Sequence, residues 1–353
     1  MIFRQLYDAQ SSTYTYLLGC PESREAILID PVYEQFNRDA ALLRELGLRV
    51  RYTLDTHVHA DHVTAAWKLK QNLGADIALS ARYAIPEVDI ALGDGDVLSF
   101  GNHSVTALHT PGHTVGCMCF VTRDRDRVFT GDALLIRAAG RTDFQGGDVH
   151  SMWRSIREVL FALPDACLVY PGHDYNGRTV STIGEEKRFN PRIGGDAREE
   201  DFVGYMNNLG LPHPRLLDIA VPANLHCGKP AFDAAAPEPA WAPIVTSFAG
   251  VPELEPDWIA RHLDDVMLLD VRTPAEFNGD LGHVDSATLI PLDELRDRLE
   301  EVPRDKPVTV ICQSGKRSAM AVQILQKAGV ERVANSSGGM LQWVRLGLPH
   351  RTR

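Results

Sequence analysis

The chain has 353 residues, 44% of them hydrophobic, so it is long enough to bury the core of two domains or of one large domain. Its 36 basic and 47 acidic side chains give a net charge of −11, which excludes general binding to nucleic acid or to anionic lipid. An anionic substrate must therefore meet a local group of basic side chains.

The beginning of the chain, MIFRQLYDAQSSTYTYLL, has no basic segment followed by an apolar run, as a signal peptide would have. No apolar stretch is long enough to span a bilayer, so we expect no membrane partner. The six cysteines lack the close regular spacing of a disulfide framework, and we interpret Cys117 and Cys119 as small buried hydrophobic residues. These features favour a reducing, cytoplasmic setting.

Short apolar runs alternate with amphipathic segments through the first part of the chain. The pattern predicts strands at 13–20, 25–32, 49–56, 104–110, 117–123 and 127–133, and a strand that runs into a loop at 166–175. It predicts helices at 34–47, 62–74 and 151–163, the first two closed by glycine. Strands that gather into sheets with helices outside them predict a layered α/β sandwich.

The composition changes near residue 228, where GKPAFDAAAPEPAWAPI is rich in proline and alanine and has no clear period. We interpret residues 231–257 as a linker. The strand and helix pattern then restarts, with strands expected within 264–272, 307–318 and 332–339 and helices at 292–302 and 319–329. We therefore expect two domains, at 1–230 and 258–353, of which the second is a small α/β domain.

Metal-binding side chains crowd into one short segment, THVHADH. Packing gives no reason to place three histidines at this spacing, so the segment predicts a metal site. Further candidates follow later strands in TPGHT, TGDALL and YPGHDY, each directly after a glycine that lets the backbone turn. Imidazole and carboxylate suit zinc or iron, and no matching cysteine set points to a structural zinc site. The seven candidates are His57, His59, Asp61, His62, His113, Asp132 and His173.

These motifs, in this order, resemble the metallo-β-lactamase superfamily over roughly the first 230 residues, which implies an αββα sandwich. Two branches of the superfamily fit the candidates. In enzymes of the glyoxalase II type, all seven positions bind two metal ions, and a bridging water hydrolyses a glutathione thioester. In persulfide dioxygenases, two histidines and one aspartate bind a single iron. The number of candidates alone favours the dinuclear hydrolase.

Three longer stretches resemble the persulfide dioxygenases: TGDALLIRAAGRTDFQGGD, PGHDYNGRTVSTIGEEKRFNPR and LLDIAVPANLHCGKP. The sequence shows no equivalent of the helical glutathione-binding region that follows the glyoxalase II core. The resemblance implies one Fe(II) per chain, bound by His57, His113 and Asp132. The other four candidates would surround these ligands, or would bind a second metal ion in the alternative branch.

Two histidines and a carboxylate on one side of Fe(II) leave positions open on the other side. O2 and a persulfide sulfur can then lie side by side, so that the sulfur is oxidised to sulfite and the thiol is released. The resemblance implies glutathione persulfide as the substrate. Arg141, Tyr175 and Arg178 lie near the metal motifs and are candidates for binding its carboxylates, and the resemblance supports Arg141 and Tyr175. The alternative for each is an ordinary solvated arginine or a packed tyrosine.

A second motif begins at Cys312, which ends an apolar strand in VTVICQSGKRSAMAV. A thiolate here would face loop N–H groups and the positive end of the following helix, and these lower a thiol pKa. From about residue 258 onward the chain resembles the rhodaneses, and the segment matches their C-x-x-G-x-R active loop. The resemblance implies that Cys312 carries a persulfide, in a loop of Cys312, Gln313, Ser314, Gly315, Lys316 and Arg317.

Together the resemblances imply a persulfide dioxygenase fused to a rhodanese. The first domain would oxidise glutathione persulfide with O2 to glutathione and sulfite, and the second would move sulfane sulfur between thiosulfate or sulfite and glutathione. A dinuclear zinc hydrolase of glutathione thioesters is the alternative, with a second domain that is catalytic or only binds sulfur. The resemblance also admits a homodimer.

Overall fold

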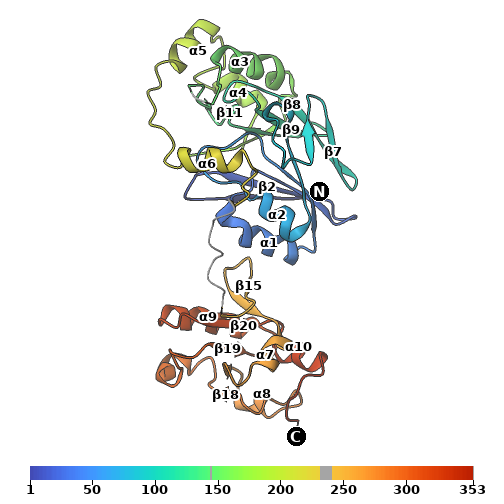
Figure 1. Cartoon of the computed structure of the whole chain (residues 1–353), viewed down its shortest axis with the longest axis vertical. Helices are drawn as coiled ribbons and strands as arrows, with labels where there is room; N and C mark the ends of the chain where they lie inside the picture. Colours follow the sequence, from blue (N-terminus) through green and yellow to red (C-terminus); the bar gives the residue numbers. More distant parts are fainter. Residues whose placement is uncertain (144, 231–240, 353) are drawn as a thin grey trace. The chain divides into compact units, whose positions relative to one another are not determined.

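The computed structural model of the chain describes residues 1–143, 145–230 and 241–352, which form two compact units. The first unit contains two six-stranded sheets (Figure 1). The strands of the first sheet lie in chain order: β1 (Ile2–Tyr7), β2 (Tyr14–Gly19), β3 (Glu25–Ile29), β4 (Arg49–Leu54), β5 (Asp76–Ser80) and β6 (Ile90–Leu92). The strands from β3 to β6 are parallel, whereas β1, β2 and β3 pair antiparallel.

The second sheet has the order β14-β13-β10-β9-β8-β7. Its strands are β7 (Val97–Phe100), β8 (His103–His109), β9 (Met118–Thr122), β10 (Arg127–Gly131), β13 (Leu168–Pro171) and β14 (Ser181–Thr182). A short hairpin of β11 (Leu134–Leu135) and β12 (Ala138–Ala139) follows β10. Only β10 and β13 run parallel within this sheet.

An aromatic core lies between the two sheets. Tyr14, Tyr16 and Leu18 alternate along β2 and share this core with side chains from the second sheet. The ring centroids of Tyr16 and Phe129 are 4.9 Å apart, although the two residues belong to different sheets. Each large side chain buried in this way contributes roughly 1.5–3 kcal/mol to the free energy of unfolding.

Helices cover the outer faces of both sheets, and their apolar sides form separate clusters there. Figure 1 shows α1 and α2 beside the first sheet and α3 and α4 beside the second. The described α-helices before residue 230 are α1 (Phe36–Glu45), α2 (Ala66–Leu73), α3 (Val149–Arg154), α4 (Ile183–Phe189), α5 (Glu199–Met206) and α6 (Leu217–Asn224). The layers confirm the predicted αββα sandwich.

Backbone hydrogen bonds join the loops at one end of both sheets. The Met118 N–H donates to the Thr56 carbonyl at 2.8 Å, and the Gly172 N–H donates to the Gly131 carbonyl at 2.7 Å. The Tyr14 N–H donates to the Gly172 carbonyl at 2.8 Å. Every predicted metal ligand belongs to one of the loops gathered at this end.

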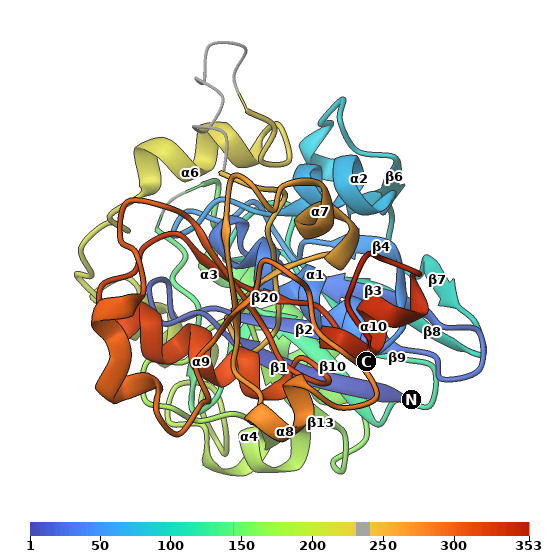
Figure 2. The same ribbon diagram turned by 90° about the horizontal axis from the view of Figure 1, so that it is seen from below.

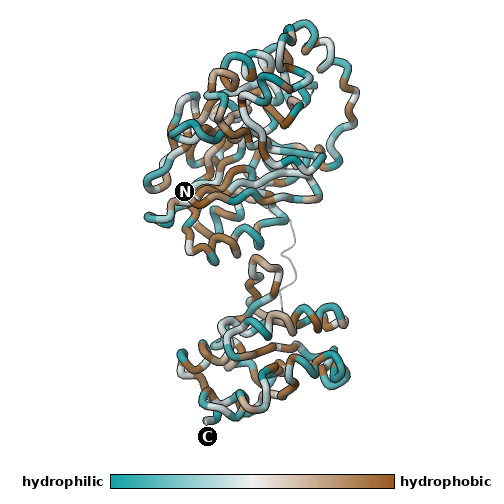
Figure 3. Tube along the Cα trace, turned by 180° about the vertical axis from the view of Figure 1, so that it is seen from behind, coloured by the Kyte–Doolittle hydropathy of each residue, from teal (hydrophilic) through white to brown (hydrophobic). Residues whose placement is uncertain are grey.

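The second unit is built on a six-stranded sheet of order β15-β16-β20-β19-β17-β18, parallel except between β15 and β16. Figure 2 shows α9 on one side of this sheet and α7 and α10 on the other. Its strands are β15 (Val245–Thr246), β16 (Pro252–Leu254), β17 (Met267–Asp270), β18 (Thr288–Leu289), β19 (Val308–Ile311) and β20 (Val333–Ser336). Its helices are α7 (Pro256–Arg261), α8 (Pro274–Phe277), α9 (Lys316–Lys327) and α10 (Gly339–Arg345). Figure 3 shows hydrophobic residues along the inner strands of each unit.

Some expectations need correction. The helix predicted from residue 62 begins at Ala66, because residues 62–65 belong to the ligand-bearing loop. The helix predicted at 292–302 is a 3-10 helix, Leu295–Glu301. Part of the expected linker forms β15 and β16 in the sheet of the second unit, and its residues 231–240 lie outside the described residues. The expected domain limits of 1–230 and 258–353 stay a prediction.

All six cysteines are free and buried. Burial raises the pKa of the Cys117 thiol to about 12 and also raises that of Cys119, so both thiols stay protonated, in agreement with their interpretation as small hydrophobic residues. Among the described helices, none is long and apolar enough to cross a membrane. The cytoplasmic setting stays a prediction.

Candidate metal centre and persulfide loop

The structure brings all seven predicted metal ligands to one end of the sandwich. Four of them follow β4, and the others follow β8, β10 and β13, as the sequence predicts. The five histidines among them are at most 5% exposed. Five imidazole rings withdrawn from water need partners other than solvent, which a metal ion and neighbouring carboxylates can supply.

One group consists of His57, His113 and Asp132, whose ligand atoms all lie within 4.8 Å of one another. The distance from His113 Nε2 to Asp132 Oδ2 is 3.7 Å. The rings of His57 and His113 meet edge to face, with centroids 4.8 Å apart. Three donors this close can contact one cation together.

Hydrogen bonds fix which nitrogen each histidine presents. His113 Nδ1 lies 2.7 Å from the Arg141 carbonyl, which can only accept, so Nδ1 carries the proton and Nε2 is the nitrogen that presents a lone pair to a metal ion. The Thr56 hydroxyl donates to Asp30 at 2.9 Å and therefore accepts from His57 Nδ1 at 2.9 Å. His57 consequently also presents Nε2.

The electrostatics of the group suit metal binding. Burial, followed by the neighbouring histidines, holds the pKa of His57 well below its usual value, and burial also lowers the pKa of His113. Burial would raise the pKa of Asp132, but His173 and His113 hold it below its usual value. Two neutral imidazoles and one carboxylate are the protonation states that a metal ion requires.

The remaining candidates form a second group beside the first. His59, Asp61 and His62 also have ligand atoms within 4.8 Å of one another. Within the described part of the chain, His59 Nδ1 and His62 Nε2 are buried without a hydrogen-bond partner. These two nitrogens could contact a second cation, so the donor set for a dinuclear site is also present.

His173 joins the two groups through hydrogen bonds to two carboxylates. Its Nδ1 lies 2.6 Å from Asp132 Oδ1, and its Nε2 lies 2.9 Å from Asp61 Oδ2. Burial would lower the pKa of His173, but the two carboxylates hold it well above its usual value. Both ring nitrogens act as donors in this arrangement, and the imidazolium provides positive charge between the carboxylates.

The three predicted substrate-binding residues differ in their surroundings. The Arg141 guanidinium is held by Asp143 at 2.6 Å and by the carbonyls of Leu211 and Pro212 at 3.0 and 2.6 Å. Tyr175 is 71% exposed, and its ring stacks on His173 with centroids 6.1 Å apart. Arg178 donates to the Ile136 carbonyl at 3.0 Å, a contact within the fold. Of the three, Tyr175 is the side chain that the structure places openly beside the ligand group.

In the second unit, Cys312 follows β19 and faces the turn that begins α9. Its sulfur accepts hydrogen bonds from the Gly315 N–H and from the Ser318 hydroxyl, both at 3.2 Å. Gly315 has a φ of +88°, which favours glycine and lets this N–H point at the sulfur. Burial opposes ionisation, but these donors lower the pKa of the Cys312 thiol below its usual value.

Arg317, the last residue of this loop, forms an ion pair. Its guanidinium donates to both carboxylate oxygens of Glu276, at 2.6 and 2.8 Å. That pairing offsets much of the arginine charge, whereas Lys316 stays exposed at the start of α9. The hydrogen bonds at the sulfur, rather than the arginine, are the direct contacts that favour the Cys312 thiolate.

Comparison with known proteins matches both units. The profile of the metallo-β-lactamase superfamily matches residues 9–173, and that of the rhodanese-like domain matches residues 255–346. The persulfide dioxygenases ETHE1 of Mus musculus and Homo sapiens are each 48% identical to this chain over 228 residues, covering 65% of this chain and 89% of theirs. The chain belongs to the persulfide dioxygenase branch of the metallo-β-lactamase superfamily.

Two further comparisons, one with each branch of the superfamily, bear on this assignment. The crystal structure of ETHE1 from Myxococcus xanthus is 50% identical, with a TM-score of 0.63, and matches over 65% of this chain and 100% of that one. The hydroxyacylglutathione hydrolase GloC of Haemophilus influenzae is 35% identical over 191 residues, covering 48% of this chain and 88% of that protein. The persulfide dioxygenases thus match more of the chain at higher identity than this hydrolase does.

The persulfide dioxygenase domain contains a positioning residue that sequence reasoning missed. Asn224, at the end of α6, donates to the carbonyls of His59 and His62 at 2.9 and 2.8 Å. It accepts from the Thr64 N–H at 2.9 Å. The side chain is only 3% exposed and holds the ligand-bearing loop from 160 or more residues away. No local pattern marks such an asparagine, although its segment carried the family resemblance.

Replacing Asn224 by alanine is expected to weaken metal retention by the persulfide dioxygenase domain. The change leaves three backbone groups of the loop without partners, and losses of outer partners lower metal affinity by about 10–100-fold. The metal that remains after dialysis against a chelator measures the effect. Asn72→Ala is the control, because Asn72 is an exposed asparagine whose side chain bonds within α2. Equal metal retention in the two variants would show that Asn224 does not have this role.

Proposed function

We propose that the first domain oxidises glutathione persulfide with O2 at a single iron, and that Cys312 transfers sulfane sulfur in the second. The observation that carries the first part is the group of His57, His113 and Asp132, whose donor atoms converge within 4.8 Å. The 48% identity to persulfide dioxygenases supports the same interpretation. A thiol with a lowered pKa in a rhodanese-like domain supports the second part.

The donor set fits iron, since two histidines and one carboxylate are the ligands of many non-haem iron oxygenases. Fe(II) bound by these residues would supply adjacent open positions for O2 and for the persulfide sulfur. The chain keeps the two imidazoles neutral by burial, and His173 orients Asp132 by holding one of its oxygens. Arg141 and Tyr175 would bind the carboxylates of glutathione.

The reaction that we propose is balanced. Glutathione persulfide, O2 and water give glutathione and sulfurous acid, which ionises to sulfite. The sulfane sulfur is oxidised, O2 is reduced, and the bond between the two sulfur atoms breaks. One water supplies the third oxygen of sulfite and the hydrogen that glutathione gains.

The second reaction is a pair of sulfur transfers. The Cys312 thiolate attacks the outer sulfur of thiosulfate, so that sulfite leaves and an enzyme persulfide forms. Glutathione thiolate then takes that sulfur and regenerates the Cys312 thiolate. The Gly315 N–H and the Ser318 hydroxyl lie where they stabilise the negative sulfur in both steps.

The homodimer that the family resemblance admits stays a prediction.

The full chain, purified without added metal, tests the proposal. We expect about one iron per chain and rapid oxygen uptake on addition of glutathione persulfide. Glutathione alone is the control and should consume no oxygen. An iron-loaded sample that takes up no oxygen with the persulfide would overturn the dioxygenase function.

The dinuclear hydrolase is the second candidate, because the unpartnered nitrogens of His59 and His62 offer donors to a second cation. It predicts about two zinc ions per chain and hydrolysis of a glutathione thioester. We favour the mononuclear site because a persulfide dioxygenase is 48% identical over 65% of this chain, whereas the hydrolase GloC is 35% identical over 48% of it. The same metal analysis and a thioester assay separate the two candidates.

A further inference from the structure

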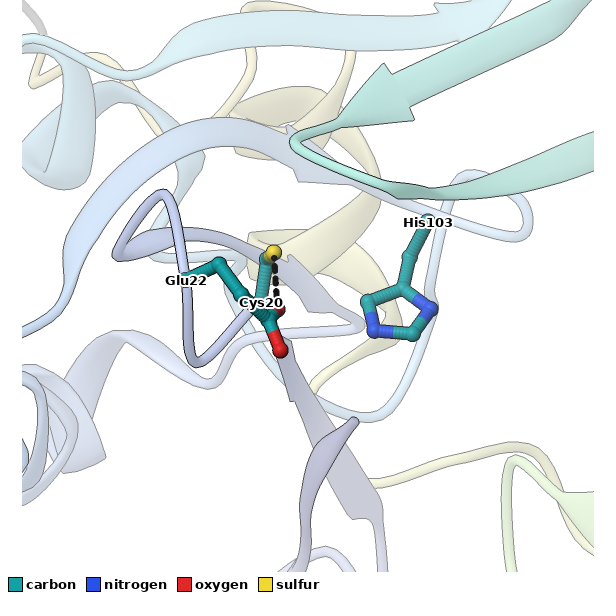
Figure 4. A group of neighbouring side chains, drawn as sticks. All are labelled: Cys20, Glu22 and His103. Carbon is teal, nitrogen blue, oxygen red and sulfur yellow. Dashed lines mark hydrogen bonds between the residues drawn. The ribbon is translucent and has the colours of Figure 1, made fainter.

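A second convergence of ligand-type side chains lies outside the proposed iron centre. Cys20, Glu22 and His103 have ligand atoms that all lie within 4.8 Å of one another, and Figure 4 shows the three side chains close together. The Cys20 thiol donates to Glu22 Oε2 at 3.1 Å. Of the candidate metal groups among the described residues, this one alone contains a cysteine.

The group is separate from the iron centre because it occupies the opposite end of the same strands. Cys20 directly follows β2, whose first residue, Tyr14, bonds to Gly172 beside His173, which holds the proposed ligand Asp132. His103 begins β8, which ends at His109, shortly before the ligand His113. At about 3.3 Å per residue, the length of β2 puts roughly 17 Å between the two sites.

Cys20 and Glu22 belong to one turn with a defined backbone, and His103 directly follows another. The turn after β2 is closed by bonds from the Cys20 N–H to the Glu25 carbonyl and from the Arg24 N–H to the Cys20 carbonyl. The turn between β7 and β8 donates the Gly101 N–H to Glu25 Oε2 at 2.8 Å. A Cβ on Gly101 would lie 2.6 Å from Cys20 Sγ, so the two turns are in close contact.

We propose that Cys20, Glu22 and His103 bind one divalent cation of the zinc class, which joins the turn after β2 to the turn between β7 and β8. Sulfur, imidazole nitrogen and carboxylate oxygen are the ligands that zinc takes, and water would complete a tetrahedron. The cation replaces the proton shared by Cys20 and Glu22, and that proton is released to solvent. A thiolate and a carboxylate then balance its two charges.

Two properties of the group favour this exchange. The Ser23 hydroxyl, followed by the backbone N–H groups of Ser23 and Asn102, lowers the pKa of the Cys20 thiol below its usual value, which makes the proton easier to displace. Glu22 is exposed and His103 half-buried, so a cation can enter from solvent although Cys20 itself is buried. Because β2 and β8 belong to different sheets, a cation here would tie the two sheets together away from the chemistry.

Cobalt titration of the iron-loaded full chain tests the site. A thiolate bound to Co2+ gives a charge-transfer absorption in the near ultraviolet, and the proposed iron ligands include no cysteine. We expect this band to saturate at about one cobalt per chain. Cys20→Ser and His103→Ala should each lose it, while His103→Ala keeps the oxygen uptake of the parent. Zinc should raise the melting temperature of the parent and not that of His103→Ala.

Two further variants are matched controls for the cobalt absorption band. His109→Ala removes a histidine from the other end of β8 and should retain the band. Cys312→Ser should retain it too, because that thiol belongs to the second domain. Absence of the band in the parent would overturn the site, as would its survival in His103→Ala or its loss in Cys312→Ser.

Discussion

Asp132→Asn is expected to empty the proposed iron site and to abolish the proposed oxygen uptake with glutathione persulfide. The substitution keeps the shape of the side chain but removes the one negative charge in the proposed ligand group. It also replaces the acceptor that holds His173 at 2.6 Å. Loss of an outer partner alone costs about 10–100-fold, so we expect more than about 100-fold here. Iron content and oxygen uptake are the two measurements.

Asp61→Asn is the matched control for that variant. Asp61 also bonds to His173, at 2.9 Å, but lies in the second donor group. With one iron, Asp61→Asn should retain about one metal per chain and lose activity at most about 100-fold. Unchanged circular dichroism would show that both variants fold. Loss of one metal out of two in Asp61→Asn would contradict the mononuclear assignment.

Cys312→Ser is expected to abolish sulfur transfer from thiosulfate to glutathione while oxygen uptake stays at the parental rate. A serine hydroxyl ionises far above neutral pH and forms no persulfide, so transfer should fall by more than about 1,000-fold. Sulfite release from thiosulfate measures the reaction. Cys167→Ser is the control, because that thiol belongs to the first domain and burial raises its pKa to about 11. If sulfur transfer survives in Cys312→Ser, the catalytic role assigned to this thiol is wrong, and the second domain would only bind sulfur.

The pH dependence of that transfer follows from the hydrogen bonds at the sulfur. The lowered pKa of Cys312 keeps the thiolate at pH values below the ordinary thiol pKa of about 8.5. Transfer should therefore decline only as the pH falls through this lowered pKa, which lies below that of an ordinary thiol. Ser318→Ala removes one donor and should move this decline to higher pH. An unchanged pH profile in Ser318→Ala would show that the other hydrogen-bond donors lower the pKa of Cys312.

Much of the site could be predicted from the sequence because its residues stand in short, recognisable motifs. The imidazoles of His57, His59 and His62 stand too close in the chain for packing to explain them. Single ligands such as His113 were recognisable only because each follows an apolar strand. The strands themselves were predictable where apolar side chains alternate, as along β2, whose alternate residues enter the core.

The rest depended on contacts between distant segments. Nothing near Arg141 indicates that its guanidinium holds the carbonyls of Leu211 and Pro212, about seventy residues later. The pairing of Arg317 with Glu276 likewise joins two separate elements. Residues 62–65 have helical sequence character, but the needs of the ligand loop override that propensity. Tertiary interactions of this kind produce no periodic pattern in the amino-acid sequence.

The hydrogen bonds from Asn224 also determine when, during synthesis, the ligand-bearing loop can become fixed. All candidate iron ligands lie before residue 174, yet the backbone groups of the loop at 59–64 find their partner 160 to 165 residues downstream. A nascent chain must therefore emerge from the ribosome past α6 before this loop can be fixed. We therefore expect metal loading to be a late step of biogenesis, because a prematurely terminated polypeptide that lacks α6 would carry every candidate ligand without the asparagine that secures their loop.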